Sequence, residues 1–314
     1  MEYSRLGSTG LWVSRFCFGT LPMGPLQASL DAGTCRQLLA RAVELGVNFF
    51  DTADLYQTYP YLRSALAGHD RVVIASKSYA YDAQTMARDL ERARRELDRD
   101  VVEVFLLHEQ ESRLTLAGHR PALDYLVEQR ERGRVKAVGI STHVVEVVEE
   151  AAGMPEVDVI HPLINLAGMG IRGGGRADME AAIGRATRAG KGIYIMKALG
   201  GGHLHGNARE ALAYAAALPG VHAVAVGVKS VDELEVDLAW LLGKEPPAHR
   251  LAKLAATPRR LLIEPWCQGC GQCVARCSQR ALSIQEGRAS VDVSICVLCG
   301  YCAASCSHFC IKVV

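Results

Sequence analysis

The sequence predicts an α/β protein, a (β/α)8 TIM barrel followed by a small α+β domain that is rich in cysteine. Two observations lead to this prediction. Over residues 1–243, short runs rich in β-branched residues alternate with longer amphipathic stretches, which is the rhythm of parallel strands joined by helices. After residue 266 the chain carries nine of its 11 cysteines, eight of them in two evenly spaced runs.

The barrel is expected to hold eight strands and eight helices. Eight such units in about 240 residues fit a closed barrel better than an open doubly wound sheet, and no G-x-G-x-x-G motif follows the first strand. Helical patterns include 83–98 and 230–240, and the second begins with a capping box of Ser230 and Glu233. The expected strands are 15–20, 47–53, 72–78, 101–109, 135–141, 157–165, 192–199 and 223–228.

The composition excludes several classes of protein. A net charge of +1 gives no reason to expect a nucleic-acid or anionic-membrane partner. Charge or glycine interrupts the apolar stretches well before the roughly 18 residues that a membrane span needs. The opening "MEYSRLGSTG" lacks a basic segment followed by an apolar run, so we expect a cytoplasmic protein whose cysteines are reduced.

Four titratable residues stand at the carboxyl ends of three expected strands, where barrels of this class carry their chemistry. They are Asp51, Tyr56, Lys77 and His108. A tyrosine hydroxyl is a weak acid with a pKa of about 10; a nearby ammonium lowers that value, and an aspartate holds the ammonium in place. A histidine can orient a carbonyl oxygen. Taken singly, Lys77 is more typical of a surface charge at a strand end and His108 of a hydrogen-bonded polar residue at the barrel rim; the joint arrangement of the four favours function.

The segments "NFFDTADLY", "IASK" and "FLLH", taken in order after the opening "EYSRLGSTGLWVSRFCFGT", resemble those of the aldo-keto reductases. These are (β/α)8 enzymes that reduce carbonyls with NAD(P)H. The resemblance covers residues 1–243. It implies that Tyr56 is the general acid, that Lys77 and Asp51 tune it, and that His108 orients the substrate.

The same resemblance implies that a nicotinamide dinucleotide lies extended across the barrel mouth. Two of the residues that would hold the nicotinamide depart from the family pattern, since Thr142 replaces an asparagine and His161 replaces a glutamine. A cation at Lys229 favours NADP(H) over NAD(H), and Asp237 replaces an asparagine that contacts adenine. The implied cofactor contacts are Ser141, Thr142, His161, Leu199, Gly200, Gly201, Lys229 and Ser230.

The two cysteine runs, each C-x2-C-x2-C-x3-C with 18 residues between them, resemble a bacterial ferredoxin with two [4Fe–4S] clusters. Zinc is the competing metal, but its sites usually use two Cys-x2-Cys pairs, so the third close cysteine would be redundant. We expect a linker at 244–263 and a ferredoxin domain at 264–314, with Cys310 left over. The resemblance implies crossed ligation: Cys267, Cys270, Cys273 and Cys306 for one cluster, and Cys296, Cys299, Cys302 and Cys277 for the other.

The leading hypothesis is an NADP-linked, iron–sulfur-containing oxidoreductase of the aldo-keto reductase type. Its partners would be a small carbonyl or alcohol substrate and a redox protein. One alternative is a one-electron reductase that takes electrons from the clusters without nicotinamide. Another is a non-catalytic redox sensor or electron carrier with a relic barrel. The clusters would also stabilise a domain of about 50 residues that is too small for a core of its own.

Overall fold

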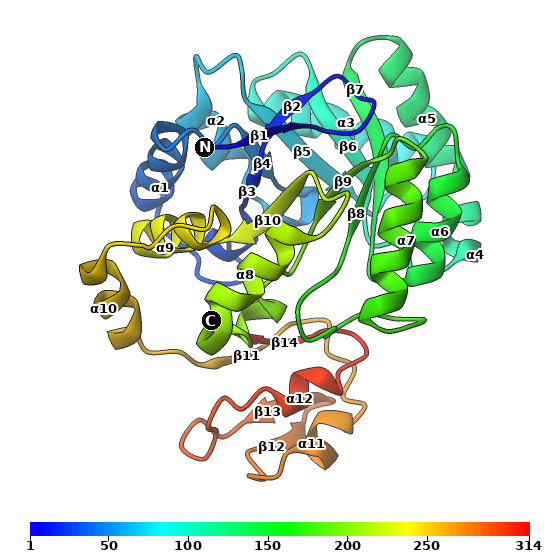
Figure 1. Ribbon diagram of the computed structural model, residues 1–314. Helices are drawn as coiled ribbons and strands as arrows, with labels where there is room; N and C mark the ends of the chain where they lie inside the picture. The colour runs from blue at the N-terminus through cyan, green and yellow to red at the C-terminus, as the bar shows by residue number, and fades with distance from the viewer.

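A computed structural model describes residues 1–314. Eight parallel strands close into a barrel, since the last strand pairs with the first (Figure 1), which confirms the predicted (β/α)8 architecture. Most of the strands are shorter than the apolar runs that predicted them, because the polar residues at the carboxyl ends turn away into loops. The strands are β3 (Phe16–Gly19), β4 (Phe49–Asp51), β5 (Val73–Ser78), β6 (Val102–Leu107), β7 (Val135–Thr142), β8 (Val159–Pro162), β9 (Gly192–Ile195) and β10 (Ala223–Gly227).

Helices surround the barrel. The capping box predicted at 230–233 is only half formed: the Ser230 hydroxyl accepts from the Glu233 N–H at 3.1 Å, whereas the Glu233 carboxylate accepts from the Lys229 N–H at 2.8 Å. No helix is long and apolar enough to cross a membrane. The helices are α1 (Ala32–Glu44), α2 (Tyr59–Leu66), α3 (Ala83–Leu97), α4 (Arg113–Gly118), α5 (Arg120–Glu131), α6 (Val145–Gly153), α7 (Arg176–Arg188), α8 (Ala208–Ala217) and α9 (Val231–Leu241).

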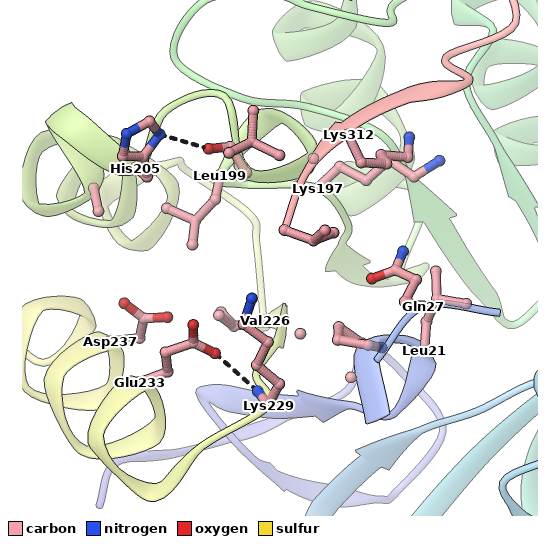
Figure 2. A pocket seen from close by; sticks show the side chains of 18 of the residues that line it. Leu21, Gln27, Lys197, Leu199, His205, Val226, Lys229, Glu233, Asp237 and Lys312 are labelled. Atoms are coloured by element: carbon pink, nitrogen blue, oxygen red, sulfur yellow. Dashed lines mark hydrogen bonds between the residues drawn. The ribbon is translucent and has the colours of Figure 1, made fainter. Parts of the chain in front are cut away.

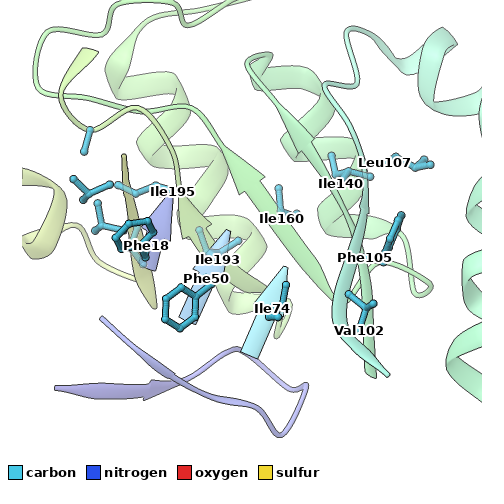
Figure 3. Close-up of a cluster of buried hydrophobic side chains, with 14 of the residues drawn as sticks. Phe18, Phe50, Ile74, Val102, Phe105, Leu107, Ile140, Ile160, Ile193 and Ile195 are labelled. Carbon is cyan, nitrogen blue, oxygen red and sulfur yellow. The ribbon is translucent and has the colours of Figure 1, made fainter. Parts of the chain in front are cut away.

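Two apolar cores stabilise the barrel. Outward-facing strand residues such as Phe50, Phe105 and Ile160 pack against the helices (Figure 3). A second cluster, which includes Val104, also takes in Leu6 from the N-terminal hairpin of β1 (Tyr3–Arg5) and β2 (Trp12–Ser14). The hairpin thus packs onto the inner cluster, and the polar strand ends face the opposite end of the barrel.

The C-terminal segment lies at the mouth end (Figure 1). Helix α10 (Ala248–Ala256) packs on α9, where Arg250 pairs with Asp232 and Glu235. Strands β11 (Leu261–Ile263) and β14 (Ile311–Val313) then form an antiparallel pair next to the barrel, and β12 (Leu282–Gln285) pairs with β13 (Arg288–Val291) further out. Two short helices, α11 (Gln272–Arg276) and α12 (Tyr301–Ala304), complete the segment.

Strand β14 packs against the glycine-rich loop that follows β9. A Cβ atom at Gly201 would lie 2.8 Å from the Lys312 side chain, and one at Gly202 would lie 2.0 Å from the Val313 carbonyl oxygen. His203 also bonds to the Ile311 carbonyl oxygen at 3.0 Å. Gly201, which is one of the implied cofactor contacts, and Gly202 therefore also admit the C-terminal strand, an approach that the sequence did not predict.

Replacing Gly202 by alanine tests this contact between the loop and β14. Its φ of +87° disfavours any side chain, at a cost of roughly 1 kcal/mol, and the clash with Val313 adds to it. We expect a lower thermal midpoint and faster tryptic cleavage near Arg260, since β14 would be displaced. The control is Gly133→Ala, because Gly133 has a φ of +73° and no neighbour within 4 Å. Equal effects of the two changes would show that Gly202 is needed for its φ alone.

Candidate active site

Adjacent strands bring the four expected catalytic residues together. Asp51 ends β4, Lys77 lies in β5, His108 follows β6, and Tyr56 ends a short turn (Asp54–Tyr56). The Lys77 ammonium donates to both Asp51 carboxylate oxygens at 2.7 Å and to the Thr52 carbonyl oxygen at 2.8 Å. It lies 5.1 Å from the centre of the Tyr56 ring, and the His108 ring lies 5.8 Å from the same ring.

The protonation states differ in one respect from the sequence expectation. Burial raises the pKa of Tyr56 well above 10, and the negative charge of Asp51 adds to this effect. The Lys77 ammonium is hydrogen-bonded to Asp51 and Thr52 and not to the phenol. Tyr56 is therefore protonated at neutral pH, as a general acid must be. Burial also lowers the pKa of His108 to about 3, so His108 is neutral.

Further polar residues at the strand ends complete the mouth. Tyr79 stacks on His108 with ring centres 4.3 Å apart and donates to the Glu109 carboxylate at 2.6 Å. The His143 Nε2 lies 2.8 Å from the Lys197 ammonium and 3.4 Å from Glu109. The sequence analysis missed these residues, although Glu109, His143 and Lys197 each follow a strand and the strand-end rule applies to them equally.

A cavity of about 1160 Å³ extends from this mouth along the face of the barrel (Figure 2). Tyr56 and His161 line one part of it, and Lys229 and Asp237 line another. The C-terminal segment contributes to its wall through Phe309 and Lys312, among others. The cavity is large enough for an extended dinucleotide together with a small substrate.

The residues expected to hold the nicotinamide differ in their placement. His161 lines the cavity, and its Nδ1 lies 2.6 Å from the Tyr194 carbonyl oxygen. Because a carbonyl only accepts, Nδ1 carries the proton and Nε2 of the neutral ring is an acceptor. The Ser141 hydroxyl instead accepts from the Glu109 N–H at 2.8 Å, and the Thr142 hydroxyl donates to the Gln110 carbonyl oxygen at 2.6 Å. Neither hydroxyl lines the cavity.

The other expected contacts lie in or beside the cavity. Leu199, Gly201 and Lys229 line it, whereas Gly200 is buried beneath and Ser230 caps α9. Figure 2 shows Lys229 and Asp237 on the same side of the cavity.

Burial raises the pKa of Asp237 to about 8. Its carboxyl is therefore largely protonated at neutral pH and can donate as well as accept, like the asparagine it replaces. Arg259 and Arg260 from the linker also line the cavity and add positive charge that the sequence analysis did not anticipate.

The eight cysteines of the two runs surround two small cavities, four around each. Their Sγ atoms accept backbone hydrogen bonds: Cys277 from Ala281 at 3.3 Å, Cys267 from Ala289 at 3.4 Å and Cys306 from Cys310 at 3.3 Å. No group of three or more His, Cys, Asp or Glu side chains is arranged to hold a single metal ion. The first cavity is lined by Cys267, Cys270, Cys273, Cys306 and Cys310, and the second by Cys277, Cys296, Cys299 and Cys302.

His161 makes the stability of the barrel sensitive to acid. Burial lowers its pKa from 6.5 to about 4, so its neutral form contributes fully above pH 6.5 and that contribution is lost as the pH falls toward 4. Between pH 7 and pH 5, His161→Gln should lose roughly 2 kcal/mol less stability than the unaltered protein, measured by thermal or urea unfolding. The exposed His249→Gln is the control and should follow the unaltered protein. An unchanged slope in His161→Gln would contradict the assignment.

The barrel is similar to known proteins in sequence. The model of the aldo/keto reductase family matches residues 15–210. The chain is 45% identical over 56 residues to the uncharacterized oxidoreductase YrpG and 22% identical over 184 residues to the aldo-keto reductase YhdN, both of Bacillus subtilis. These matches span 18% and 53% of this chain and 16% and 54% of the two relatives. The chain thus covers less than two thirds of either relative's length.

Solved structures show the same likeness. The "putative aldo-keto reductase" PA4992 of Pseudomonas aeruginosa superposes with a TM-score of 0.67 at 27% identity, over 77% of this chain and 94% of that one. The holo form of aldo-keto reductase AKR11C1 of Bacillus halodurans superposes with a TM-score of 0.67 at 19% identity, over 81% and 96% of the two chains. The second likeness concerns the fold alone.

Proposed function

Because this chain belongs to the aldo/keto reductase family of oxidoreductases, we propose that it interconverts a carbonyl group and the corresponding alcohol at the barrel mouth, with NAD(P)H as the hydride donor. One observation carries the proposal: the Lys77 ammonium is locked 2.7 Å from both Asp51 oxygens and faces the ring of a protonated Tyr56 in a large cavity. Bound NAD(P)H would supply the hydride.

The residues of this chain would supply the proton. Tyr56 donates its hydroxyl proton to the carbonyl oxygen as negative charge develops there. The Lys77 ammonium, kept charged by Asp51, then stabilises the phenolate that remains. Neutral His108 lies beside Tyr56 and orients the carbonyl oxygen. Residues of β14 line the same cavity and would reduce the access of water to a bound substrate.

The residues along the cavity fit a nicotinamide dinucleotide. The free Nε2 of His161 can accept from a carboxamide N–H. At the other end, Lys229, Arg259 and Arg260 line the cavity beside the N-terminus of α9, where backbone amides favour phosphate. This concentration of positive charge supports NADP(H) rather than NAD(H). Ser141 and Thr142 are held by backbone groups, so His161 carries more of the nicotinamide binding than the sequence analysis implied.

Tyr56→Phe tests the chemistry at the mouth. The change removes only the hydroxyl, so we expect turnover to fall about 100- to 10,000-fold while the Kd for NADPH is unchanged. Oxidation of NADPH with 4-nitrobenzaldehyde measures the first, and direct titration of NADPH measures the second. Tyr61→Phe in α2 is the control and should retain full turnover. Unchanged turnover in Tyr56→Phe would exclude Tyr56 as the acid.

For the C-terminal segment we propose a ferredoxin-like domain at 264–314 that holds two [4Fe–4S] clusters through the crossed cysteine sets. Each set of four surrounds one cavity, and amide N–H groups donate to three of the sulfurs, as is usual for cysteines that ligate clusters. The clusters would supply one-electron transfer. A redox protein is the expected partner, because the clusters exchange electrons one at a time.

A second candidate function is the reduction of substrate by electrons from the clusters without nicotinamide. One observation favours it: consecutive residues of one short segment line both kinds of cavity. Phe309 lines the barrel cavity, and Cys310 lines the cavity of Cys267 and Cys306. The cysteine cavity and the barrel cavity therefore share one short segment of chain, along which a cluster could exchange electrons with the barrel. Direct titration of NADPH separates the two candidates, because only the first requires binding.

Iron content tests the cysteine assignment. Protein purified without oxygen should contain about eight iron atoms per chain. Cys306→Ser should lose about half of that iron, together with its visible absorption. Cys310 lines the same cavity but falls outside the spacing pattern, so Cys310→Ser serves as the matched control and should keep all of it. Zinc in place of iron, or loss of iron only in Cys310→Ser, would contradict the assignment.

A further inference from the structure

Two lysines at the barrel mouth, Lys197 and Lys312, have no part in the proposed proton transfer. We infer that they bind a carboxylate group carried by the carbonyl substrate. The substrate class would then be an oxo acid, that is, an aldehyde or ketone with one carboxylate. This inference rests on the proposed function, and it concerns the same cavity.

Lys312 is a buried cation without an anionic partner. Its side chain comes from β14 in the C-terminal segment, is 5% exposed and lines the barrel cavity. The ammonium donates to the Phe309 carbonyl oxygen and lies 3.4 Å from the centre of the Phe309 ring, but it forms no ion pair. An unpaired ammonium is costly to bury, so burial lowers the pKa of Lys312 well below the ordinary value, and the charged form needs an anion beside it. An anion in the cavity would restore the missing partner.

Lys197, in the loop that follows β9 of the barrel, lines the same cavity as Lys312. Figure 2 shows the Lys197 and Lys312 side chains running alongside each other, with their amine ends close together. Lys197 has a left-handed φ of +62°, a strain that proteins tend to keep at functional sites. Its ammonium lies 4.7 Å from the centre of the Phe309 ring, so both lysines contact the same aromatic ring.

The charged groups around the two lysines do not provide an anionic partner for both of them. Glu109 lies 3.7 Å from Lys197 and also accepts from Tyr79. Burial opposes the charge of Glu109, but Lys197 and its other neighbours hold its pKa below the usual range. Glu264 accepts from Gln27 at 3.3 Å and forms no ion pair with either lysine; burial raises its pKa, and the nearby charge of Lys312 opposes that rise.

Burial lowers the pKa of His143 well below 6.5, so its ring is neutral and does not compete for an anion. Of the two lysines only Lys197 has a carboxylate, Glu109, within 4 Å, and the Lys312 amine is left without an anionic partner.

The position of the two lysines also suits a substrate. Tyr56, Lys197 and Lys312 line one cavity, so a small molecule can place its carbonyl at Tyr56 and its carboxylate at the lysines. The Phe309 ring, 1% exposed, lines the cavity beside the two lysines and offers an apolar surface there. The phosphates of a dinucleotide are the other anions that could occupy this position, and the experiment separates the two sources.

The test uses full-length, cluster-replete protein and two probes. Benzoate, a monocarboxylate that undergoes no hydride transfer, is titrated by calorimetry in the presence of NADP. Phenylglyoxylate and its uncharged methyl ester are compared as substrates. Lys312→Met and Lys197→Met should each raise the Kd for benzoate and the KM for phenylglyoxylate at least about tenfold, with little change for the ester. Lys312→Arg should retain most of the binding, and the exposed Lys244→Met is the control.

The outcomes separate the possibilities. A weaker Kd for NADPH with unchanged benzoate binding would assign the lysines to the cofactor phosphates and overturn the inference, as would unaltered binding of both. Lys312→Met should fold with a midpoint equal to or above that of the unaltered protein, because an apolar side chain replaces an unpaired charge. Benzoate binding requires no turnover. Intact, lysine-dependent binding in a protein that reduces no carbonyl would therefore refute the proposed function and not the carboxylate site.

Discussion

The ion pair between Lys77 and Asp51 is the contact on which the mouth of the barrel depends. Closure of the barrel places β4 beside β5, and the two side chains then meet at 2.7 Å, almost fully buried. Removing one partner of such a pair leaves an uncompensated charge in the interior, at a cost of about 3–5 kcal/mol. The pair also fixes its neighbours, because the Tyr194 hydroxyl donates to Asp51 at 3.0 Å and His161 stacks on Tyr194. Asp51, Lys77, Tyr194 and His161 therefore form one connected network, and the Tyr56 ring lies against its Lys77 end.

The C-terminal segment forms part of the wall around this network. Phe309, Lys312 and Val313 line the cavity opposite the strand ends, and Gly201 and Gly202 allow them to come close. Removing a charge from water disfavours its charged form, which is why burial is the largest cause of the shifted pKa values of Tyr56 and His108. The position of the segment thus affects the environment of the barrel mouth, independently of any group that its cysteines bind.

The sequence predicted the barrel because strand–helix alternation is a local signal, and each expected run contains a strand. It predicted Asp51, Tyr56, Lys77 and His108 because they stand in recognisable segments. Glu109 and His143 occupy equivalent strand ends but lie in no such segment. Phe309 and Lys312 were beyond reach for a different reason: their contacts with Gly201 and Lys197 join residues more than 100 positions apart, and local patterns do not say how two domains dock.

The residues that lead into β14 contact both the barrel and the cysteine-rich domain. Cys310 donates its N–H to the Cys306 sulfur, while its neighbour Phe309 packs against Lys197 and Lys312. Stabilisation of the cysteine domain alone does not explain why this segment buries a lysine without a counter-ion in the barrel cavity. Covering the barrel mouth alone does not explain why four cysteines surround a cavity on the other side of the segment. Because neighbouring residues of one short segment make the two sets of contacts, a displacement of this segment would alter both the cysteine cavity and the barrel cavity.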